Sequence, residues 1–357
     1  MSRAVTRRYI DPLTQVWVSA AHRIGLTVIR TADAYAATDG RGTLAIGGAD
    51  ALDADDSLAQ MIFHELCHSL VEGPDSFTRA DWGMDNTGPD HDWREHACLR
   101  AQWLLAGRYG LRGVFAPTTD FRAFWDTLAG TDVLADREDR STIAAIAAVQ
   151  RAGEPPWSPA LLDALAATAR IAAAAAPAAR ADAAASGNDA SLWSLVEPAR
   201  AAHPTGLPAG EVAGTCGGCA WRYTFRGGAR CRQAEVRVDP AWTACERYEA
   251  AGSVDCLTCG ACCREAYQAV ELTRRDPCAR AHPELIVDHG TYLELARRPG
   301  PTGDRDRCMA LHGGEVQGTR VARYHCTIYE DRPRTCRDFT LGSEHCLTAR
   351  QRVGLSL

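Results

Sequence analysis

The sequence predicts an α+β protein made of two unlike parts: a small, mostly helical N-terminal domain with a short sheet, and an irregular, cysteine-rich C-terminal region. Three observations lead to this prediction. Of the 15 cysteines in 357 residues, 13 lie in residues 216–357. Helical spacing of apolar residues dominates the first half of the chain. An alanine-rich stretch of low complexity separates the two parts. The length agrees, since ~100–200 residues per domain predicts at least two domains.

The N-terminal elements follow from hydrophobic spacing and turn residues. Residues 12–24 have near-helical spacing, and the β-branched segment 25–30 predicts a strand. A turn at Asp39-Gly40 precedes a second predicted strand over 42–48. The acidic entry and apolar spacing of 55–72 predict a helix, and a loop rich in Gly, Pro and Asp follows over 73–91. Further helices are predicted over 93–110, 119–128, 139–151 and 158–176.

Composition and charge exclude several classes of protein. With 46% hydrophobic and 24% charged residues, the chain has an ordinary soluble composition. No stretch reaches the ~18–20 apolar residues of a spanning helix, so no membrane partner is expected. Residues 1–215 carry 18 Arg against 27 acidic residues, and residues 216–357 carry 21 Arg against 18. Neither half is basic enough to predict nucleic acid binding.

The N-terminus predicts a cytoplasmic location. Its first residues, MSRAVTRRYIDPLTQVW, include basic side chains but lack the apolar core of a signal peptide. Thiols stay reduced in the cytoplasm, where dense cysteines bind metal more often than they form disulfides. Disulfides are the alternative if the compartment is oxidising.

The predicted helix at 55–72 contains His64-Glu65-Leu66-Cys67-His68, which matches the pattern HExxH. Residues four apart share a helix face, so His64 and His68 can bind one Zn²⁺. Glu65 lies about 100° around the axis from His64, where it can reach a water at the metal and act as a general base. The alternative interpretation is an ordinary buried helix with two satisfied histidines.

A catalytic zinc keeps three protein ligands, so a third is needed. The extended pattern HExxHxxGxxH fails, because Val71 and Pro74 stand at its Gly and third His positions. Glu95 on the next predicted helix fits, because small residues follow it at helical spacing and let two helices approach. His96 and His91 are the alternatives.

Two strands, an HExxH helix, a loop and a Glu-bearing helix together resemble the compact gluzincin core, and most of all the ImmA/IrrE-like metallopeptidases. The resemblance rests on HELCH (64–68) and EHAC (95–98), within about residues 15–110. It implies a zincin-like fold, Zn²⁺ bound by His64, His68 and Glu95, and an extended peptide that adds to the edge strand GTLAIGG. Cys98 stands where the second motif of that family has Ala.

Other residues near the motif are expected to be structural. Cys67 and Cys98 are interpreted as small packing residues. The aspartates of the connecting loop are expected to be solvated, although they could select a basic substrate: Asp75, Asp81, Asp85, Asp90 and Asp92.

A first group of four cysteines has the spacings x2, x11 and x13: Cys216, Cys219, Cys231 and Cys245. Four thiolates with one CxxC pair suffice for a tetrahedral Zn²⁺ or an iron–sulfur cluster. Thiolate ligands select both metals, so the pattern leaves the choice open.

A second group contains eight cysteines: Cys256, Cys259, Cys262, Cys263, Cys308, Cys326, Cys336 and Cys346. With CGACCR, YEDRP and CRDF, it resembles the YkgJ family over about residues 254–354, a CxxCxxCC domain described as zinc- or iron-chelating. Eight cysteines could form two four-ligand sites or one multinuclear centre. Adjacent Cys262 and Cys263 are poorly placed to ligate one ion in the same geometry. Cys278 is additional, and we expect a packed free thiol there.

These motifs divide the chain into four segments. We predict an HExxH zinc hydrolase-like domain with C-terminal helices at 1–172, an Ala-rich linker at 173–212, a four-cysteine metal site at 213–252 and a YkgJ-like domain at 253–357. The leading hypothesis is a zinc metallohydrolase, most simply a peptidase acting on a peptide or protein, with a cysteine module that is structural or senses redox state or metal. The alternative is an iron–sulfur or metal-handling oxidoreductase or accessory protein whose HExxH site is not proteolytic.

Overall fold

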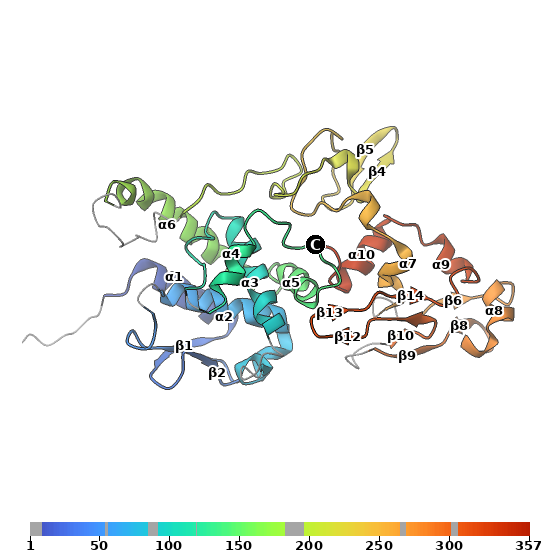
Figure 1. Ribbon diagram of the computed structural model, residues 1–357, viewed down its shortest axis with the longest axis horizontal. Coiled ribbons are helices and arrows are strands. Elements are labelled where there is room, and N and C mark those ends of the chain that lie inside the picture. The colour runs from blue at the N-terminus through green and yellow to red at the C-terminus, as the bar shows by residue number, and fades with distance from the viewer. Residues whose placement is uncertain are drawn as a thin grey trace, which may run out of the picture. The chain divides into compact units, whose positions relative to one another are not determined.

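The computed structural model describes residues 9–53, 56–84, 92–118, 120–182, 196–264, 269–300 and 306–357. The chain forms two compact units (Figure 1): Met1–Thr131 with Ala148–Arg200, and Asp132–Ala147 with Ala201–Leu357. The boundary near residue 200 lies inside the predicted linker at 173–212, whose first residues still belong to a helix. Residues 132–147, which we expected in the first domain, belong to the second unit. Helices and small sheets occur in both units, which confirms the α+β class.

The helices of the first unit lie where the spacing of apolar residues predicts them. They are α1 (Pro12–Ile24), α2 (Leu58–Glu72), α3 (Asp92–Gly107), α4 (Arg122–Thr127), α6 (Ala160–Asp182) and the last residues of α5 (Arg140–Arg151). Asp11 caps α1 by accepting the backbone N–H groups of Leu13 and Thr14. Ser57 accepts from Gln60 at the start of α2, and that helix ends before Gly73, whose φ is 84°.

A three-stranded sheet accompanies these helices, with β1 (Thr27–Thr31), β2 (Ala36–Thr38) and β3 (Thr43–Gly47). Its order is β1-β3-β2, with β3 parallel to β1 and antiparallel to β2. The expectation that GTLAIGG forms the edge is therefore wrong, because β2 covers its second side. Three residues with two alanines give no alternating pattern, so the sequence did not predict β2. The turn at Asp39-Gly40 is confirmed, since the Asp39 carboxylate accepts the N–H of Arg41 at 2.8 Å.

Aromatic side chains form the centre of the first unit's core. The rings of Trp17 on α1, Phe63 on α2 and Phe115 lie with centroids 4.8–5.3 Å apart. Trp17 also donates its indole N–H to Thr168 on α6 at 3.0 Å. Buried contacts of this kind hold α2 in one rotation about its axis, which decides the direction of His64 and His68.

The expectation that no stretch of the chain is long and apolar enough to span a membrane does not hold for residues 160–177 of α6. They are long and apolar enough to do so by length and composition, and 39% of them are buried in this structure. Alanines make this stretch apolar without the large side chains that usually mark a membrane-spanning helix. Here α6 packs against α1, with Leu161 and Leu165 fully buried.

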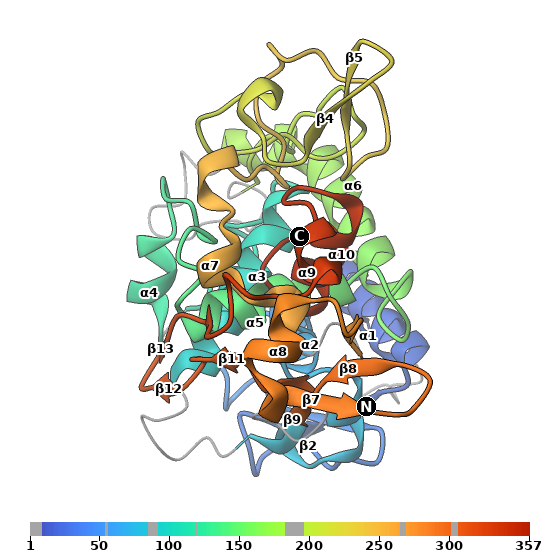
Figure 2. The ribbon, with the colours of Figure 1, turned by 90° about the vertical axis from the view of Figure 1, so that its right-hand side faces the viewer.

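The second unit is built from much shorter elements (Figure 2). Its helices are α7 (Cys256–Cys259), α8 (Pro277–Ala281), α9 (Arg334–Asp338), α10 (Glu344–Arg352) and the first part of α5. Its strands pair in small sheets: β4 (Arg222–Phe225) with β5 (Gly228–Cys231); β6 (Glu271–Leu272), β8 (Leu293–Leu295) and β7 (Ile286–Asp288); β9 (Arg297–Pro299) with β10 (Asp306–Cys308); β11 (Leu311–His312) with β14 (His325–Cys326); and β12 (Val316–Gln317) with β13 (Arg320–Val321).

Buried side chains in this unit form separate small clusters. One contains Leu295, Leu311 and Ile328 together with Cys308. Another surrounds the fully buried Trp221 and includes Cys346. A two-stranded sheet is marginally stable in water by itself, so these small sheets depend on their contacts with the rest of the unit.

Candidate metal centres

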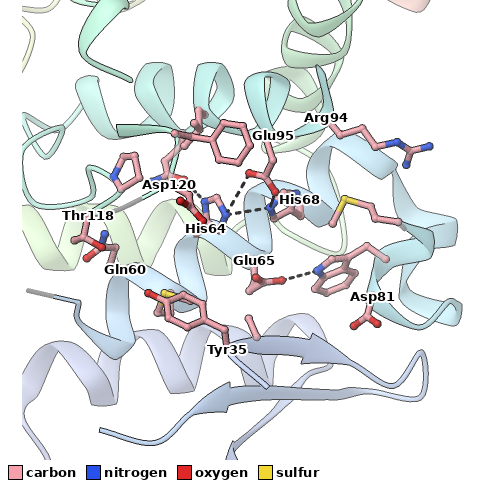
Figure 3. Close-up of a pocket in the computed structure, with 18 of the residues that line it drawn as sticks. Tyr35, Gln60, His64, Glu65, His68, Asp81, Arg94, Glu95, Thr118 and Asp120 are labelled. Atoms are coloured by element: carbon pink, nitrogen blue, oxygen red, sulfur yellow. Dashed lines mark hydrogen bonds and ion pairs between the residues drawn. The ribbon is translucent and has the colours of Figure 1, made fainter. Parts of the chain in front are cut away.

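The HExxH motif lies on α2, and its two histidines point into the same cavity (Figure 3). Their Nε2 atoms are 3.0 Å apart. Glu95 on α3 extends its carboxylate toward both, with Oε1 3.1 Å from His68 Nε2 and Oε2 3.7 Å from His64 Nε2. The structure therefore brings together the three residues that the sequence pointed to as a zinc site. A tetrahedral zinc with Zn–N of about 2.0–2.1 Å separates two ligand nitrogens by about 3.3 Å, close to the spacing here.

Small residues on α3 allow this approach. Ala97, Cys98 and Ala101 are fully buried where α3 packs against α2. The expected role of Cys98 and of Cys67, which is also fully buried, is consistent with this burial. Larger side chains at these positions would hold the helices apart and move Glu95 away from the histidines.

The other candidate ligands do not reach this point. The His96 ring stacks on Phe124 with centroids 3.8 Å apart, because one residue along a helix turns the side chain by about 100°. His91 lies outside the described residues. Val71 and Pro74, at the positions that a longer motif would use, offer no ligand atom.

Cys98 offers a rival donor set, because ligand atoms of His64, His68 and Cys98 also lie within 4.8 Å of one another. Its sulfur approaches the Nδ1 atom of His64, at 3.7 Å. That nitrogen faces away from the Nε2 atoms that converge with Glu95, and it donates to Gln102 Oε1 at 3.0 Å. Burial raises the pKa of the Cys98 thiol well above its usual range, which keeps it neutral. We therefore favour Glu95 as the third ligand.

Gln102 orients the first histidine. Its amide nitrogen donates to the carbonyl of Phe115, which leaves its oxygen to accept from His64. His64 then carries its proton on Nδ1 and presents a lone pair on Nε2, as a metal ligand must. Sequence reasoning missed this residue, although Gln102 lies two turns after Glu95 on the same face of α3.

The charges of the site couple Glu95 to both histidines. Burial opposes a charge on His68, but the carboxylates of Glu95, Glu65 and Glu72 outweigh it and raise the pKa of His68 to about 9. Burial likewise opposes the charge of Glu95, and the two histidines outweigh it and lower the pKa of Glu95 to about 2. The negative surroundings therefore favour a bound cation, either a proton or a metal ion.

Glu65 turns away from the two histidines and remains at the cavity (Figure 3). Its carboxylate accepts the indole N–H of Trp82 at 2.8 Å, and only 8% of the residue is exposed. A hydrogen bond to one carboxylate oxygen fixes the other in position. The sequence showed no sign of this partner, because Trp82 lies in the loop after α2.

The turn that carries Trp82 has an uncommon backbone. Asp81 and Trp82 have φ values of 47° and 58°, in the left-handed region that non-glycine residues rarely adopt. Hydrogen bonds to Thr38 of β2 hold the turn, from Thr38 N–H to the Asp81 carboxylate at 2.9 Å and from Trp82 N–H to the Thr38 hydroxyl at 3.2 Å. Such strain of about 1–3 kcal/mol persists only where surrounding contacts impose it.

The cavity around these residues has a volume of about 420 Å³ and an acidic lining. Residues of the edge strand β2 and the residue before it form one wall: Tyr35, Ala36 and Ala37. Asp81, between α2 and α3, and Asp92, the first residue of α3, also line the cavity, whereas Asp75 does not. Asp85 and Asp90 lie outside the described residues.

The first four-cysteine group comes together around the β4–β5 hairpin in the second unit. Cys216, Cys219, Cys231 and Cys245 line one enclosed space of about 10 Å³. Burial raises the pKa of Cys245 to about 11, and the charges of the three other cysteines add to this. The space has the size for a single small ion or water.

A histidine that the sequence did not indicate lines the same space. His203 is 3% exposed, and its Nε2 donates to the carbonyl of Thr243 at 2.9 Å. The Cys216 sulfur lies 3.8 Å from that nitrogen. Its Nδ1 accepts the N–H of Thr205 at 3.1 Å, so both ring nitrogens already have partners and His203 does not add a fifth ligand.

The eight cysteines of the second group also lie in the second unit. Cys256 and Cys259 bound α7, and Cys262 and Cys263 end the short 3₁₀ turn Ala261–Cys263 (η7). The others lie at strand ends and on short helices: Cys308 on β10, Cys326 on β14, Cys336 on α9 and Cys346 on α10. Cys278 is fully buried in the apolar cluster around Leu311, as expected for a packed thiol.

Comparisons with known proteins cover this region. Residues 255–352 match the model of the CxxCxxCC family, described as "Putative zinc- or iron-chelating domain". A curated relative, the uncharacterized protein YkgJ of Escherichia coli O157:H7, is 29% identical over 107 residues, which are 28% of this chain and 93% of that protein. No solved structure matches. The match lies within the second unit, so the metallopeptidase resemblance of the first stays a prediction. The C-terminal region is similar to a zinc- or iron-chelating domain, which supports a metal-binding module there and bears out the YkgJ resemblance.

Proposed function

We infer that the first unit is a zinc-dependent hydrolase with a zincin-like core, most simply a peptidase, joined in one chain to the metal-binding cysteine module. The observation that carries this proposal is the convergence of His64 Nε2, His68 Nε2 and the Glu95 carboxylate at a cavity that also holds Glu65. Two imidazoles and one carboxylate form a donor set typical of catalytic zinc. The 3.0 Å between the two Nε2 atoms is close to the spacing of two nitrogen ligands on one tetrahedral zinc, and the Glu95 carboxylate adjoins both, so the residues fit the ion.

The residues of the first unit would divide the chemistry among them. His64, His68 and Glu95 would bind the ion, and Gln102 would hold His64 in the required tautomer. When bound, zinc supplies Lewis acidity toward a carbonyl and toward water. Glu65 would take a proton from the attacking water and pass it to the leaving amine. Trp82 would keep Glu65 in place for both transfers.

The charge of the cavity lining favours a substrate with a basic segment. Asp56, Asp81, Asp92 and Asp120 face the cavity, and Arg94 is the basic residue that lines it. Arg94 is itself paired with Glu72, Nη1 to Oε2 at 2.5 Å. The exposed side of β2 beside the cavity offers backbone groups to an extended peptide. Peptides with Lys or Arg near the scissile bond should therefore be cleaved faster than those with Asp or Glu.

Replacing the general base tests the proposal directly. In the full chain, Glu65→Gln should retain zinc and the fold but lower hydrolysis of a pooled library of quenched fluorescent peptides by at least 10²–10⁴-fold. Asp75→Asn is the matched control, because it makes the same change at an exposed carboxylate that does not line the cavity. Equal cleavage by wild type and Glu65→Gln would sink the mechanism, whatever the second unit binds.

A second candidate function rests on the number of cysteines in the second unit. With twelve cysteines in two groups, the protein could be an iron–sulfur or metal-handling protein in which the HExxH site binds metal without proteolysis. Anaerobic purification, metal analysis and an absorption spectrum separate the possibilities. Iron with sulfide and a brown colour favour the iron–sulfur module, and a colourless protein with several zinc ions favours a structural or sensing module.

A further inference from the structure

The adjacent cysteines Cys262 and Cys263 pack against different apolar clusters of the second unit. Cys262 packs with Cys259 against Ala349 and Leu355. Cys263 packs against the cluster that contains Cys308. Successive residues of a 3₁₀ turn point about 120° apart, so η7 turns the two side chains toward different clusters. Their sulfurs are 3.9 Å apart, so the centres that they serve would be immediate neighbours.

We propose that the eight cysteines form two neighbouring four-cysteine metal centres, separated between Cys262 and Cys263. The outer centre consists of Cys256, Cys259, Cys262 and Cys346. The inner centre consists of Cys263, Cys308, Cys326 and Cys336. Each would bind one tetrahedral Zn²⁺ or one iron–sulfur cluster, since four thiolates satisfy either. The division rests on the metal-binding part of the proposed function and is independent of hydrolysis in the first unit.

Helix α10 brings the last ligand to the outer centre. Cys346 and Arg350 lie one turn apart on α10, which contacts η7. The Arg350 guanidinium donates to the Cys259 sulfur at 3.3 Å, and this places the two cysteines on the same side of the helix. Phe339 packs against both the Cys346 cluster and the Cys262 cluster. Arg350 is 4% exposed and is held in place by Glu249, Nη2 to Oε2 at 2.6 Å.

Strand pairing and one aspartate hold the ligands of the inner centre. Cys326 on β14 pairs with Leu311 on β11. Leu311 lies only three residues after Cys308, so this pairing brings Cys326 near Cys308. Asp276 accepts the N–H of Arg334 at 2.6 Å and so fixes the start of α9, which carries Cys336. All four sulfur-bearing residues belong to or pack against one cluster: Cys263, Cys308, Cys326 and Cys336.

The place of Cys262 follows from its packing. It lies with Cys259 against the cluster that contains Ala349 of α10, whereas Cys263 packs against the cluster of the other inner cysteines. We assign Cys262 to the outer centre, because the inner centre already has four cysteines without it and the outer centre would have three.

The two centres differ in their access to solvent. Cys256 is exposed, and Cys259 lines a cavity of about 810 Å³ within the second unit, beside Glu249 and Arg350. Cys308 is 3% exposed within an apolar cluster. The outer centre should therefore exchange metal and react with thiol reagents first, and the inner centre should be the more persistent.

Metal content of serine variants tests the division in the full chain, purified anaerobically. Cys256→Ser and Cys308→Ser should each lose the metal of one centre. The double variant Cys256→Ser/Cys346→Ser should lose no more than Cys256→Ser alone, whereas Cys256→Ser/Cys308→Ser should lose the metal of both. Cys278→Ser, the control, should keep the wild-type content. If the Cys256→Ser/Cys308→Ser variant loses no more than either single variant, one shared centre replaces the two.

Alkylation mapping of the wild-type protein avoids variants that fail to fold. The protein is loaded with Zn²⁺, treated with increasing chelator and iodoacetamide, and digested. The four outer cysteines Cys256, Cys259, Cys262 and Cys346 should be alkylated first. At that stage the peptide that contains both Cys262 and Cys263 should be alkylated on Cys262 and not yet on Cys263. Simultaneous alkylation of all eight cysteines overturns the division. Wild-type protein without metal at any of them overturns the metal-binding module of the proposed function itself.

Discussion

The two units position their candidate ligands in opposite ways. In the first unit, His64, His68 and Glu95 lie on helices of 15 and 16 residues that pack over an aromatic core. In the second, the cysteines lie on 3₁₀ turns, strand ends and helices of 4–9 residues. The hydrophobic core creates the first site without help from a metal. In the second unit, metal binding would supply stabilisation that the short elements lack.

Removing metal should separate the two units most strongly. A structural zinc contributes apparent free energies of about 10–16 kcal/mol to small cysteine domains. With excess chelator under reducing conditions, we expect the second unit to unfold and the first to stay folded. Hydrogen exchange that follows peptides from α10 and from α2 would show this. Protection of α10 that survives complete demetallation would mean that its apolar clusters suffice.

A core variant should have the reverse effect. Phe63→Ala removes a fully buried ring next to Trp17 and Phe115 and should lower the free energy of unfolding of the first unit by about 3–5 kcal/mol. Ile29→Ala is the control, because that side chain is 45% exposed and its loss should change stability by no more than about 0.5 kcal/mol. Urea unfolding measures both. The metal content of the cysteine sites should be the same in Phe63→Ala as in wild type. A changed content would contradict the view that the two units are stabilised independently.

The indole hydrogen bond to Glu65 should matter for activity beyond its effect on stability. Trp82→Phe leaves a buried carboxylate without its donor, at about 1–3 kcal/mol, and peptide hydrolysis should fall about tenfold or more. Trp157→Phe makes the same change elsewhere, since Trp157 donates to Ser69 at 2.8 Å in the same unit. Both variants should lose stability, but Trp82→Phe alone should lower kcat. Equal kcat values in the two variants would remove Trp82 from the site.

The smallest expected effect is on how the free energy of unfolding of the metal-free first unit depends on pH. The pKa of His68 is raised from 6.5 to about 9, so the stabilisation by His68 is complete below pH 6.5 and lost as the pH rises through 9. The pKa of Glu95 is lowered from 4.5 to about 2, so the stabilisation by Glu95 is present above pH 4.5 and lost as the pH falls through 2.

The His68–Glu95 pair should therefore stabilise the metal-free unit most between about pH 4.5 and 6.5, by on the order of 1 kcal/mol. Urea unfolding in chelator across this range, with Glu95→Gln as reference, measures the difference. Zinc needs a neutral His68, so zinc affinity should rise with pH up to about 9. An affinity that is independent of pH between 6 and 9 would argue against His68 as a ligand.

Local periodicity explains what the sequence by itself determined. The spacing of apolar residues placed α1, α2 and α3 to within a few residues, and a helix of any origin puts His64 and His68 on one face. Cysteine spacing identified the C-terminal region, and the family comparison agrees with it. These features depend on neighbours within about one turn, so a single sequence contains them.

Only the tertiary structure decided the features that join distant segments. It placed Glu95 and not His96 beside the histidines, because the rotation of α3 is set by its packing against α2. It made β3 central, since the pairing of strands is a long-range choice. It brought Trp82 to Glu65 across 17 residues. It also turned Cys262 and Cys263 toward different clusters, because those clusters include residues as distant along the chain as Ile328 and Leu355. Spacing cannot encode such contacts, as they depend on how complete elements pack.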